Sequence, residues 1–260
     1  MSIQSVFKNY LNLPYADSLK GDFDEAVKAM ASETMEADNL QAVLDAIVAE
    51  FNHPAFPKKA GIFLSAALPH FSEPQTLDLS AFEDVRLKGL GAFMAGPQLT
   101  VKGDLGDYTG YRMGAGKLLV EGSVADFAGM EMTGGKLEIK GLAENHLGHS
   151  MEGGEIVVKK NAHDFTGNSM VGGRITIKAN AGYSTGYRMS GGVITVRDLA
   201  WDLVGEEMSG GHISIGGHIG HEMGLSQTGG VITVTKKAGD CKRVRAEGGR
   251  MEVVEKLGKK

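Results

Sequence analysis

The sequence GDYTGYRMGAGKLLV (residues 106–120) recurs at a spacing of nineteen residues, as ADFAGMEMTGGKLEI (125–139), ENHLGHSMEGGEIVV (144–158) and HDFTGNSMVGGRITI (163–177). The series continues to residue 253, and two aliphatic columns end every repeat. The first column is Leu118, Leu137, Ile156, Ile175, Ile194, Ile213, Ile232 and Met251. The second is Val120, Ile139, Val158, Ile177, Val196, Ile215, Val234 and Val253. Mostly polar residues flank and separate these columns, and this period-two alternation predicts one short strand per repeat with one face buried.

A fixed repeat of this length indicates stacked units, each unable to bury its apolar face alone. Nineteen residues are too few for a helical hairpin or a propeller blade, but they suit one coil of a parallel β-solenoid. Successive coils then pair at a spacing of about 4.8 Å, so like positions form columns along the axis. The run GAFMAGPQLTV (91–101) carries the same pattern one residue out of register. We therefore expect about nine coils of 19 residues in a stack roughly 40 Å long.

Other columns predict the interior and the corners of the coils. Methionines and small apolar residues are expected inside, glycines at the corners, and acidic residues bonded to turn amides. These columns are Met113, Met132, Met151, Met170, Met189 and Met208; Ala143, Ala162, Ala181 and Ala200; and Asp107, Asp126, Asn145, Asp164 and Asp202. In the last repeat Cys241, Arg243 and Ala246 replace the aromatic residue, the glycine and the methionine, which is expected of a terminal cap.

The front of the chain has a different composition. Residues 1–88 hold two of the 38 glycines, and all six prolines lie at or before Pro97. Apolar spacing predicts helices around residues 23–30, over 38–51 with Asp38 as N-cap, and over 60–68. We expect a helical segment over 1–75 that caps the solenoid or docks a partner, a β-helix over 76–255, and a basic tail over 256–260.

Composition limits the functions that the chain can have. The net charge is −5 and basic residues are dense only near residues 236–242 and at the C-terminus, so nucleic acid is not an expected partner. One cysteine excludes an intramolecular disulfide framework. The first residues lack the apolar core of a signal peptide, and no apolar run approaches eighteen residues. A cytoplasmic protein without a membrane partner is expected.

Residues that could carry chemistry have structural explanations. His146, His149 and His163 could hold a metal. In a solenoid, however, their side chains point in different directions unless a corner brings them together. The acidic column could supply a carboxylate pair, as in polysaccharide-cleaving β-solenoids, yet bonding to corner amides explains it equally well. HIGH (218–221) and GAGKL (114–118) fall inside the repeat and lack the βαβ context of nucleotide sites. We predict no catalytic, cofactor or metal site, so the chain alone is not expected to be an enzyme.

One repeated feature favours a protein interface. Gly-Tyr-Arg-Met occurs at 110–113 and again at 186–189, four coils apart. Tyr111 and Tyr187 would then lie about 19 Å from each other on one side of the stack. Tyrosine and arginine are enriched at interface hot spots. Tyr111, Arg112, Tyr187 and Arg188 are therefore a candidate partner-binding ridge, although two repeats of common ancestry would also share them.

The recurring G-x-x-M-x-G-G-x-I-x-V with D-[YF]-x-G resembles the GXGXG module. This module occurs in the C-terminal domain of glutamate synthase large subunits and in the C subunits of formylmethanofuran dehydrogenase and the formyltransferase/hydrolase complex. GDYTGYRMGAGKLLVEG (106–122) and GNSMVGGRITIKANAG (167–182) are similar to the C subunit, and GLGAFMAGPQLTVKGDLGDYTG (89–110) resembles the opening of the glutamate synthase domain.

The resemblance covers residues 85–253 and implies a right-handed parallel β-helix without a cofactor. It also implies a non-catalytic scaffold within a hetero-oligomeric enzyme complex of one-carbon metabolism. The alternatives are a detached glutamate-synthase-type module of an amidotransferase or oxidoreductase complex, and a carbohydrate-active β-helix enzyme.

Overall fold

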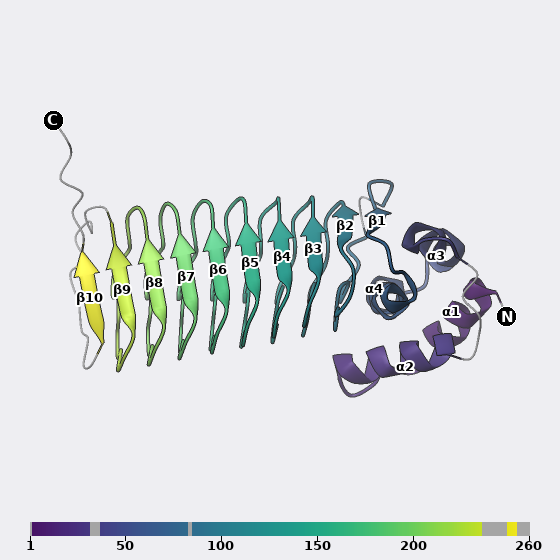
Figure 1. Cartoon of the computed structure of the whole chain (residues 1–260), viewed down its shortest axis with the longest axis horizontal. Helices are drawn as coiled ribbons and strands as arrows, with labels where there is room; N and C mark the ends of the chain where they lie inside the picture. Colours follow the sequence, from purple (N-terminus) through teal and green to yellow (C-terminus); the bar gives the residue numbers. More distant parts are fainter. Residues whose placement is uncertain (1, 32–36, 83–84, 236–248, 254–260) are drawn as a thin grey trace.

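The computed structural model describes residues 2–31, 37–82, 85–235 and 249–253. In these residues a group of short helices is followed by a long stack of strands (Figure 1). The helices are α1 (Ile3–Leu11), α2 (Leu19–Ala31), α3 (Leu40–Ile47), η1 (Val48–Glu50), α4 (Phe56–Ala67) and η2 (Leu68–His70). The strands are β1 (Gln75–Asp78), β2 (Leu99–Lys102), β3 (Lys117–Val120), β4 (Lys136–Ile139), β5 (Glu155–Val158), β6 (Arg174–Ile177), β7 (Val193–Val196), β8 (His212–Ile215), β9 (Val231–Val234) and β10 (Arg250–Val253).

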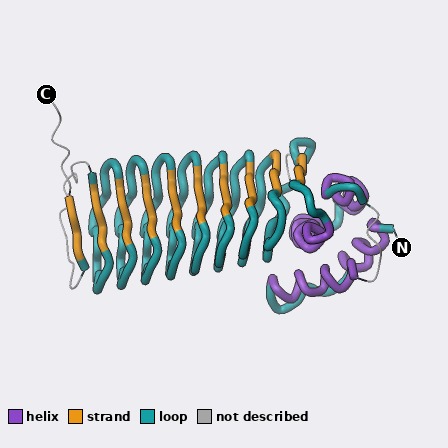
Figure 2. Tube along the Cα trace, viewed as in Figure 1, coloured by secondary structure: helices purple, strands orange, loops and turns teal. Residues whose placement is uncertain are grey.

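All ten described strands form one parallel sheet in sequence order. Each coil contains one β-strand, and the rest of the coil consists of turns and loops (Figure 2). From β2 to β10 the pairing joins residues nineteen positions apart, as Leu118 with Leu137. Only the step from β1 to β2 is longer, since Gln75 pairs with Leu99. The prediction of an all-β parallel β-helix with a small helical N-terminal segment is confirmed.

The expected one-residue offset of the first repeat is wrong. Leu99 pairs with Leu118 and Val101 with Val120, which is the same register of nineteen as in later coils. The apparent offset comes from the glycine position alone, where Pro97 occupies the place of Gly116. Register in a sheet is set by the side chains that point into the core, and here those aliphatic residues keep their spacing.

The interior of the solenoid consists of the predicted columns. The six methionines of the column, from Met113 to Met208 at intervals of nineteen, have no exposed surface, and neither have most of the aliphatic residues beside them. Gln227 continues the methionine column and is also fully buried. The alanine column forms a second, minor ladder, in which Ala143 bridges Ala162 and Ala181 bridges Ala200. The degenerate positions Cys241, Arg243 and Ala246, like the expected basic tail 256–260, lie outside the described residues.

Polar side chains at the corners tie each coil to the next. The carboxylate of Asp164 accepts a hydrogen bond from the backbone N–H of Tyr183 at 2.9 Å, nineteen residues further on. Asp126 and Asp202 accept equivalent bonds from Asn145 at 2.9 Å and from His221 at 2.7 Å. These three members of the acidic column therefore have the structural role that the sequence suggested, and their partners are amides of the following coil.

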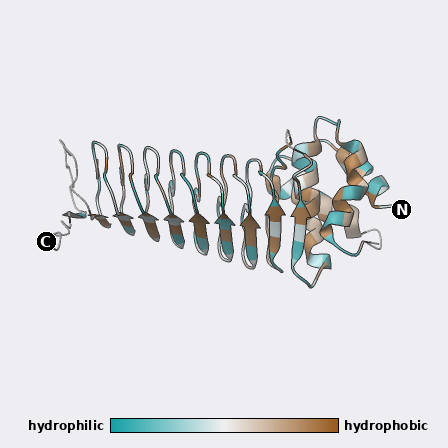
Figure 3. Ribbon diagram, turned by 90° about the horizontal axis from the view of Figure 1, so that it is seen from above, coloured by the Kyte–Doolittle hydropathy of each residue, from teal (hydrophilic) through white to brown (hydrophobic). Residues whose placement is uncertain are grey.

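The helices cover the first coil of the solenoid. Gln41 of α3 accepts a hydrogen bond from the backbone N–H of Asp78 in β1 at 2.7 Å. Farther round the coil, the ring of Phe23 lies 4.7 Å from that of Phe93. Helices and coils share one continuous cluster of buried side chains, and hydrophobic segments run through both (Figure 3). The edge of β1 is thus met by α3, and an open edge would be prone to pair with another chain.

The expected helices are present with different limits. Asp38 is not the N-cap of α3, because the side chain of Asn39 accepts the hydrogen bond from the N–H of Ala42 at 3.0 Å. The helix expected over 60–68 begins earlier, at Phe56, with Pro57 in its first turn. Helix α1 was not predicted. Among the described residues, no helix has both the length and the apolar character needed to cross a membrane.

Candidate functional site

The predicted ridge is a real column of the solenoid. Backbone hydrogen bonds join each residue of this corner to the next coil, from Arg112 N to Met130 O at 2.9 Å through to Ser169 N to Tyr187 O at 2.8 Å. Tyr111 and Tyr187 therefore occupy the same position in coils four steps apart. The structure confirms that the four ridge residues share one side, and it leaves their use in binding a partner as a proposal.

Each arginine of the ridge is fixed by a glutamate of the following coil. Arg112 Nε lies 2.6 Å from Glu131 Oε2, and Arg188 Nε lies 2.8 Å from Glu207 Oε2. The guanidinium carbons lie 5.4 Å and 4.8 Å from the centres of the preceding tyrosine rings. These hydrogen bonds raise the pKa of both arginines and lower that of Glu207. The ridge therefore presents two preorganised Tyr-Arg-Glu groups.

The backbone at this corner is left-handed. Arg112 has φ of 51° and Arg188 has φ of 53°, which costs a non-glycine residue about 1–2 kcal/mol. The same conformation recurs at Glu131, Ser150 and Ser169 in the coils between them. Because it appears in every coil, this strain belongs to the fold and does not by itself mark a site.

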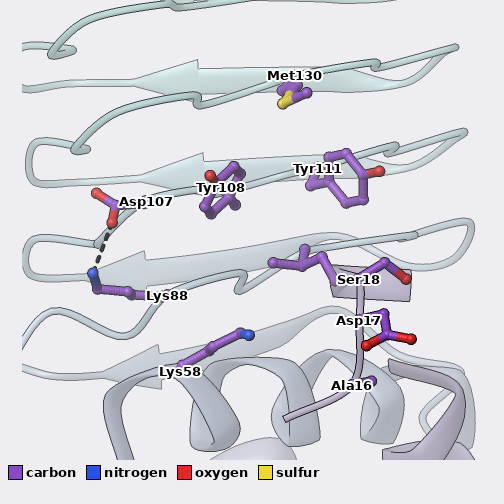
Figure 4. A pocket seen from close by; sticks show the side chains of 10 residues that line it. Ala16, Asp17, Ser18, Lys58, Lys88, Asp107, Tyr108, Tyr111 and Met130 are labelled. Atoms are coloured by element: carbon purple, nitrogen blue, oxygen red, sulfur yellow. Dashed lines mark hydrogen bonds and ion pairs between the residues drawn. The ribbon is translucent and has the colours of Figure 1, made fainter. Parts of the chain in front are cut away.

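A cleft of about 430 Å³ lies between the helical segment and the first coils, and the ridge begins inside it. The cleft is lined by Ala16, Asp17, Ser18, Leu19, Lys58, Lys88, Asp107, Tyr108, Tyr111 and Met130. Figure 4 shows Tyr108 and Tyr111 on the solenoid side and Lys58 on the helical side of this space. Sequence reasoning found Tyr111 but could not find the cleft, since its two walls are distant in sequence.

Both lysines of this cleft are paired with carboxylates of the chain. Lys88 Nζ lies 2.7 Å from Asp107 Oδ2, and Lys58 Nζ lies 2.6 Å from the buried carboxylate of Asp22. Tyr111 packs edge-on against Phe93, with ring centres 5.4 Å apart. Burial, and then the charge of Glu131, raise the pKa of Tyr111. The cleft thus offers tyrosine faces and paired charges, which suit contact with a protein surface.

The histidines belong to a stack of rings. Tyr108, Phe127, His146 and Phe165 stack nearly parallel, with centres 5.3, 4.7 and 5.0 Å apart. His149 meets His146 edge-on at 6.0 Å, and the Nδ1 atoms of both are buried without a hydrogen-bond partner. Burial, and then His146, lower the pKa of His149. His163 lines a different groove, and the described residues contain no group of three side chains suited to a metal.

Comparison with known families identifies the repeat. The model of the GXGXG motif matches residues 121–256, just over half of the chain. The chain belongs to the GXGXG motif family. A comparison with curated proteins finds no match. The GXGXG match spans coils β4 to β10 and includes Tyr187 and Arg188, whereas Tyr111, Arg112 and the helical segment precede it.

A second groove of this GXGXG protein was missed by sequence reasoning. It has a volume of about 450 Å³ and is lined by Asn145, Asn161, Ala162, His163, Asp164, Asn180, Ala181, Gly182, Tyr183 and Trp201. Tyr183 and Trp201 are exposed although both are large. The repeat columns could have indicated these two residues. Tyr183 interrupts the acidic column, and Trp201 occupies a column position that is glycine in the coils before and after it, at Gly182 and Gly220.

Proposed function

We propose that this GXGXG protein is a non-catalytic structural subunit of a multi-subunit enzyme complex. In this proposal it is most like the C subunit of formylmethanofuran dehydrogenase or of the formyltransferase/hydrolase complex, and it acts in the cytoplasm. The observation that carries the proposal is the ridge, where Tyr-Arg groups are held on one column by backbone bonds and by glutamates of the next coil. Such preorganised groups lose little side-chain entropy when a partner binds.

The acidic column supports a structural role over an enzymatic one. A carboxylate pair for acid and base chemistry needs oxygens that are free to take and give a proton. In Asp126, Asp164 and Asp202 one oxygen instead accepts a backbone N–H of the next coil. We therefore favour the scaffold hypothesis over the hypothesis of a carbohydrate-active enzyme. A monomer that cleaves a polysaccharide would end the scaffold proposal.

A detached glutamate-synthase-type module is the second candidate, because the family match fits it equally well. The identity of the co-purifying subunits separates the two. A molybdopterin or tungsten protein with a zinc hydrolase supports the one-carbon complex. A glutaminase and a flavoprotein support the glutamate-synthase-type module.

The ridge is tested by substitution in the complex purified from its native source. The ring of Tyr111 lies 5.4 Å from that of Phe93, closer than the 6.3 Å between Tyr187 and Phe165, so replacing Tyr111 costs more stability. The better variant therefore combines Arg112→Ala, Tyr187→Ala and Arg188→Ala. We expect this triple variant to weaken assembly at least tenfold, because hot-spot tyrosines and arginines contribute 1–2 kcal/mol or more each, by a rough general estimate.

The matched control is Lys136→Ala with Glu155→Ala, an ion pair of 2.9 Å on the strand face of the solenoid. The control should leave assembly unchanged, since surface ion pairs contribute about 0–1 kcal/mol. Equal assembly of the wild type and the triple variant would reject the ridge as the docking surface.

A further inference from the structure

The second groove lies over the corners of consecutive coils, from Asn145 to Trp201. Ala162 and Ala181, two buried residues of the alanine ladder, are among its lining residues. Asn145 and Trp201 are 56 residues apart, which is about three coil steps of nineteen, so the groove extends over about 14 Å along the axis at the spacing of paired strands. That length accommodates about four residues of an extended chain.

Two aromatic side chains form the wall of this groove. The indole of Trp201 is 50% exposed and the phenol of Tyr183 is 44% exposed, and their ring centres lie 5.6 Å apart at an angle of 33°. Exposed large rings are costly in water, and Trp and Tyr are the commonest anchors of protein interfaces. The pair therefore marks a surface that gains stability when an apolar group covers it.

The groove presents hydrogen-bond donors. The side-chain oxygens of Asn145 and Asn161 accept backbone N–H groups of the next coil, from Asp164 at 3.3 Å and Asn180 at 3.2 Å. Their amide NH2 groups remain for a ligand, because no hydrogen bond of these two groups is found within the described residues. A ligand that matches them must be rich in acceptors, such as carboxylates or peptide carbonyls.

A column of cations lies two residues before the groove asparagines in the sequence, with Lys159 before Asn161 and Lys178 before Asn180. Backbone bonds of 2.9–3.0 Å place Lys140, Lys159, Lys178 and Arg197 on consecutive coils. Lys140 lies 2.6 Å from Glu121, and Lys159 lies 2.9 Å from Glu138. For Lys178, no carboxylate of the described residues lies within 4.0 Å.

Arg197, the next cation of this column, has a weak partner. It reaches only its neighbour Asp198, at 4.0 Å, and both side chains are more than half exposed. Like charges on adjacent coils repel each other. An anion supplied from outside would remove this repulsion.

We propose that the groove binds an acidic, extended segment of a partner subunit. This inference rests on the proposed function. An apolar side chain of the segment covers Trp201 and Tyr183, its carboxylates face Lys178 and Arg197, and its backbone carbonyls accept from the asparagine amides. A single-stranded nucleic acid fits less well, because it carries a phosphate at every nucleotide, whereas a peptide can place an uncharged residue opposite Asp164 of the groove lining.

The first test uses the complex purified with the full-length chain. Lys178→Glu with Arg197→Glu should weaken association at least tenfold, and Trp201→Ala should do the same. Two controls carry comparable changes on other surfaces of the solenoid: Arg174→Glu, on β6 of the same coil as Lys178, and Val171→Ala, whose side chain is 57% exposed. Neither control should change association by more than twofold.

The second test identifies the occupant. A photo-crosslinking amino acid placed at Tyr183 in the assembled complex should attach to a partner segment with several Asp or Glu residues. Attachment to a segment without acidic residues, or no attachment in an intact complex, overturns the proposal while the scaffold role stands. A chain that purifies alone overturns the scaffold role as well.

Titration of the isolated chain with a single-stranded oligonucleotide gives the third arm. Trp201 is the one tryptophan of the sequence, so its fluorescence reports this groove. We expect no saturable change at 150 mM salt. Saturable quenching that Lys178→Glu abolishes would show that the groove binds nucleic acid and would refute the acidic segment.

Discussion

Replacing Met151 by alanine should lower the free energy of unfolding, because it leaves a cavity in the middle of the solenoid. Met151 has no exposed surface, and its methyl group lies so close to the next coil that a Cβ added at Gly173 would come within 2.8 Å of it. Backbone bonds from Glu152 N to Met132 O and from Val171 N to Met151 O hold the coils at a fixed distance. The cavity left by Met151→Ala therefore cannot collapse.

The magnitude follows from the three heavy atoms that are removed. Met-to-Ala changes in rigid cores cost about 2–5 kcal/mol, and we expect about 3 kcal/mol here. In a domain of this size that corresponds to a fall in Tm of about 6–12 °C. Met151→Leu conserves the volume and should cost less than about 1.5 kcal/mol.

Denaturant titration followed by circular dichroism measures both variants of Met151. The expected order of stability is wild type, Met151→Leu, Met151→Ala. If Met151→Ala loses less than about 1 kcal/mol, or no more than Met151→Leu, the methionine column does not fill a rigid core. The interpretation of the columns would then be wrong.

Three further predictions concern corners and pH. Asp164→Asn should melt within about 2 °C of the wild type, because an amide oxygen can accept the same N–H of Tyr183. Asp164→Ala should lose about 1–3 kcal/mol of unfolding free energy in denaturant titration. Equal loss in both variants would refute the role of the inter-coil bond. Gly191→Ala should lower Tm by several degrees, since its Cβ would overlap the carbonyl oxygen of Val171; an unchanged melting curve would refute this. The Ser80 hydroxyl and amide, with Lys102, lower the pKa of Asp78 from 3.8 to about 2, so the stability it contributes is present above pH 3.8 and is lost as pH falls toward 2. Asp78→Asn should flatten the dependence of stability on pH in that window, and an unaltered slope would contradict the assignment.

The columns were predictable because nineteen-residue regularity fixes which side chains face inward. Leu118 and Leu137 pair as the alternation indicated, and Met151 is buried as expected. The ends of the helices were harder to predict from the sequence. Asp38 and Asn39 are both good caps, and the choice between them depends on backbone direction, which local composition does not specify.

Helix α1 could have been found from its sequence. Ile3, Val6, Phe7, Tyr10 and Leu11 have helical spacing, and four of them are buried. The two grooves were less predictable. A groove depends on which side chains of adjacent coils leave space between them, and the first groove also needs the position of the helices. Column exceptions, such as a tryptophan between glycines, are the local signal of such sites.

The contacts between coils are compatible with the structural role that we propose. The stack repeats one geometry, and backbone N–H groups of the corners bond to carbonyl groups of the neighbouring coils. What differs from coil to coil is the set of exposed side chains, such as the ridge residues and the aromatic pair. Variation confined to the surface of a fixed frame is what a docking subunit requires.

Native mass spectrometry of the full-length chain, purified with a tag from its native source, tests the scaffold role most directly. We expect one hetero-oligomer in which this chain is bound to catalytic subunits, and we expect the chain alone to show no enzymatic activity. A monomer that is active without any partner would contradict the scaffold role.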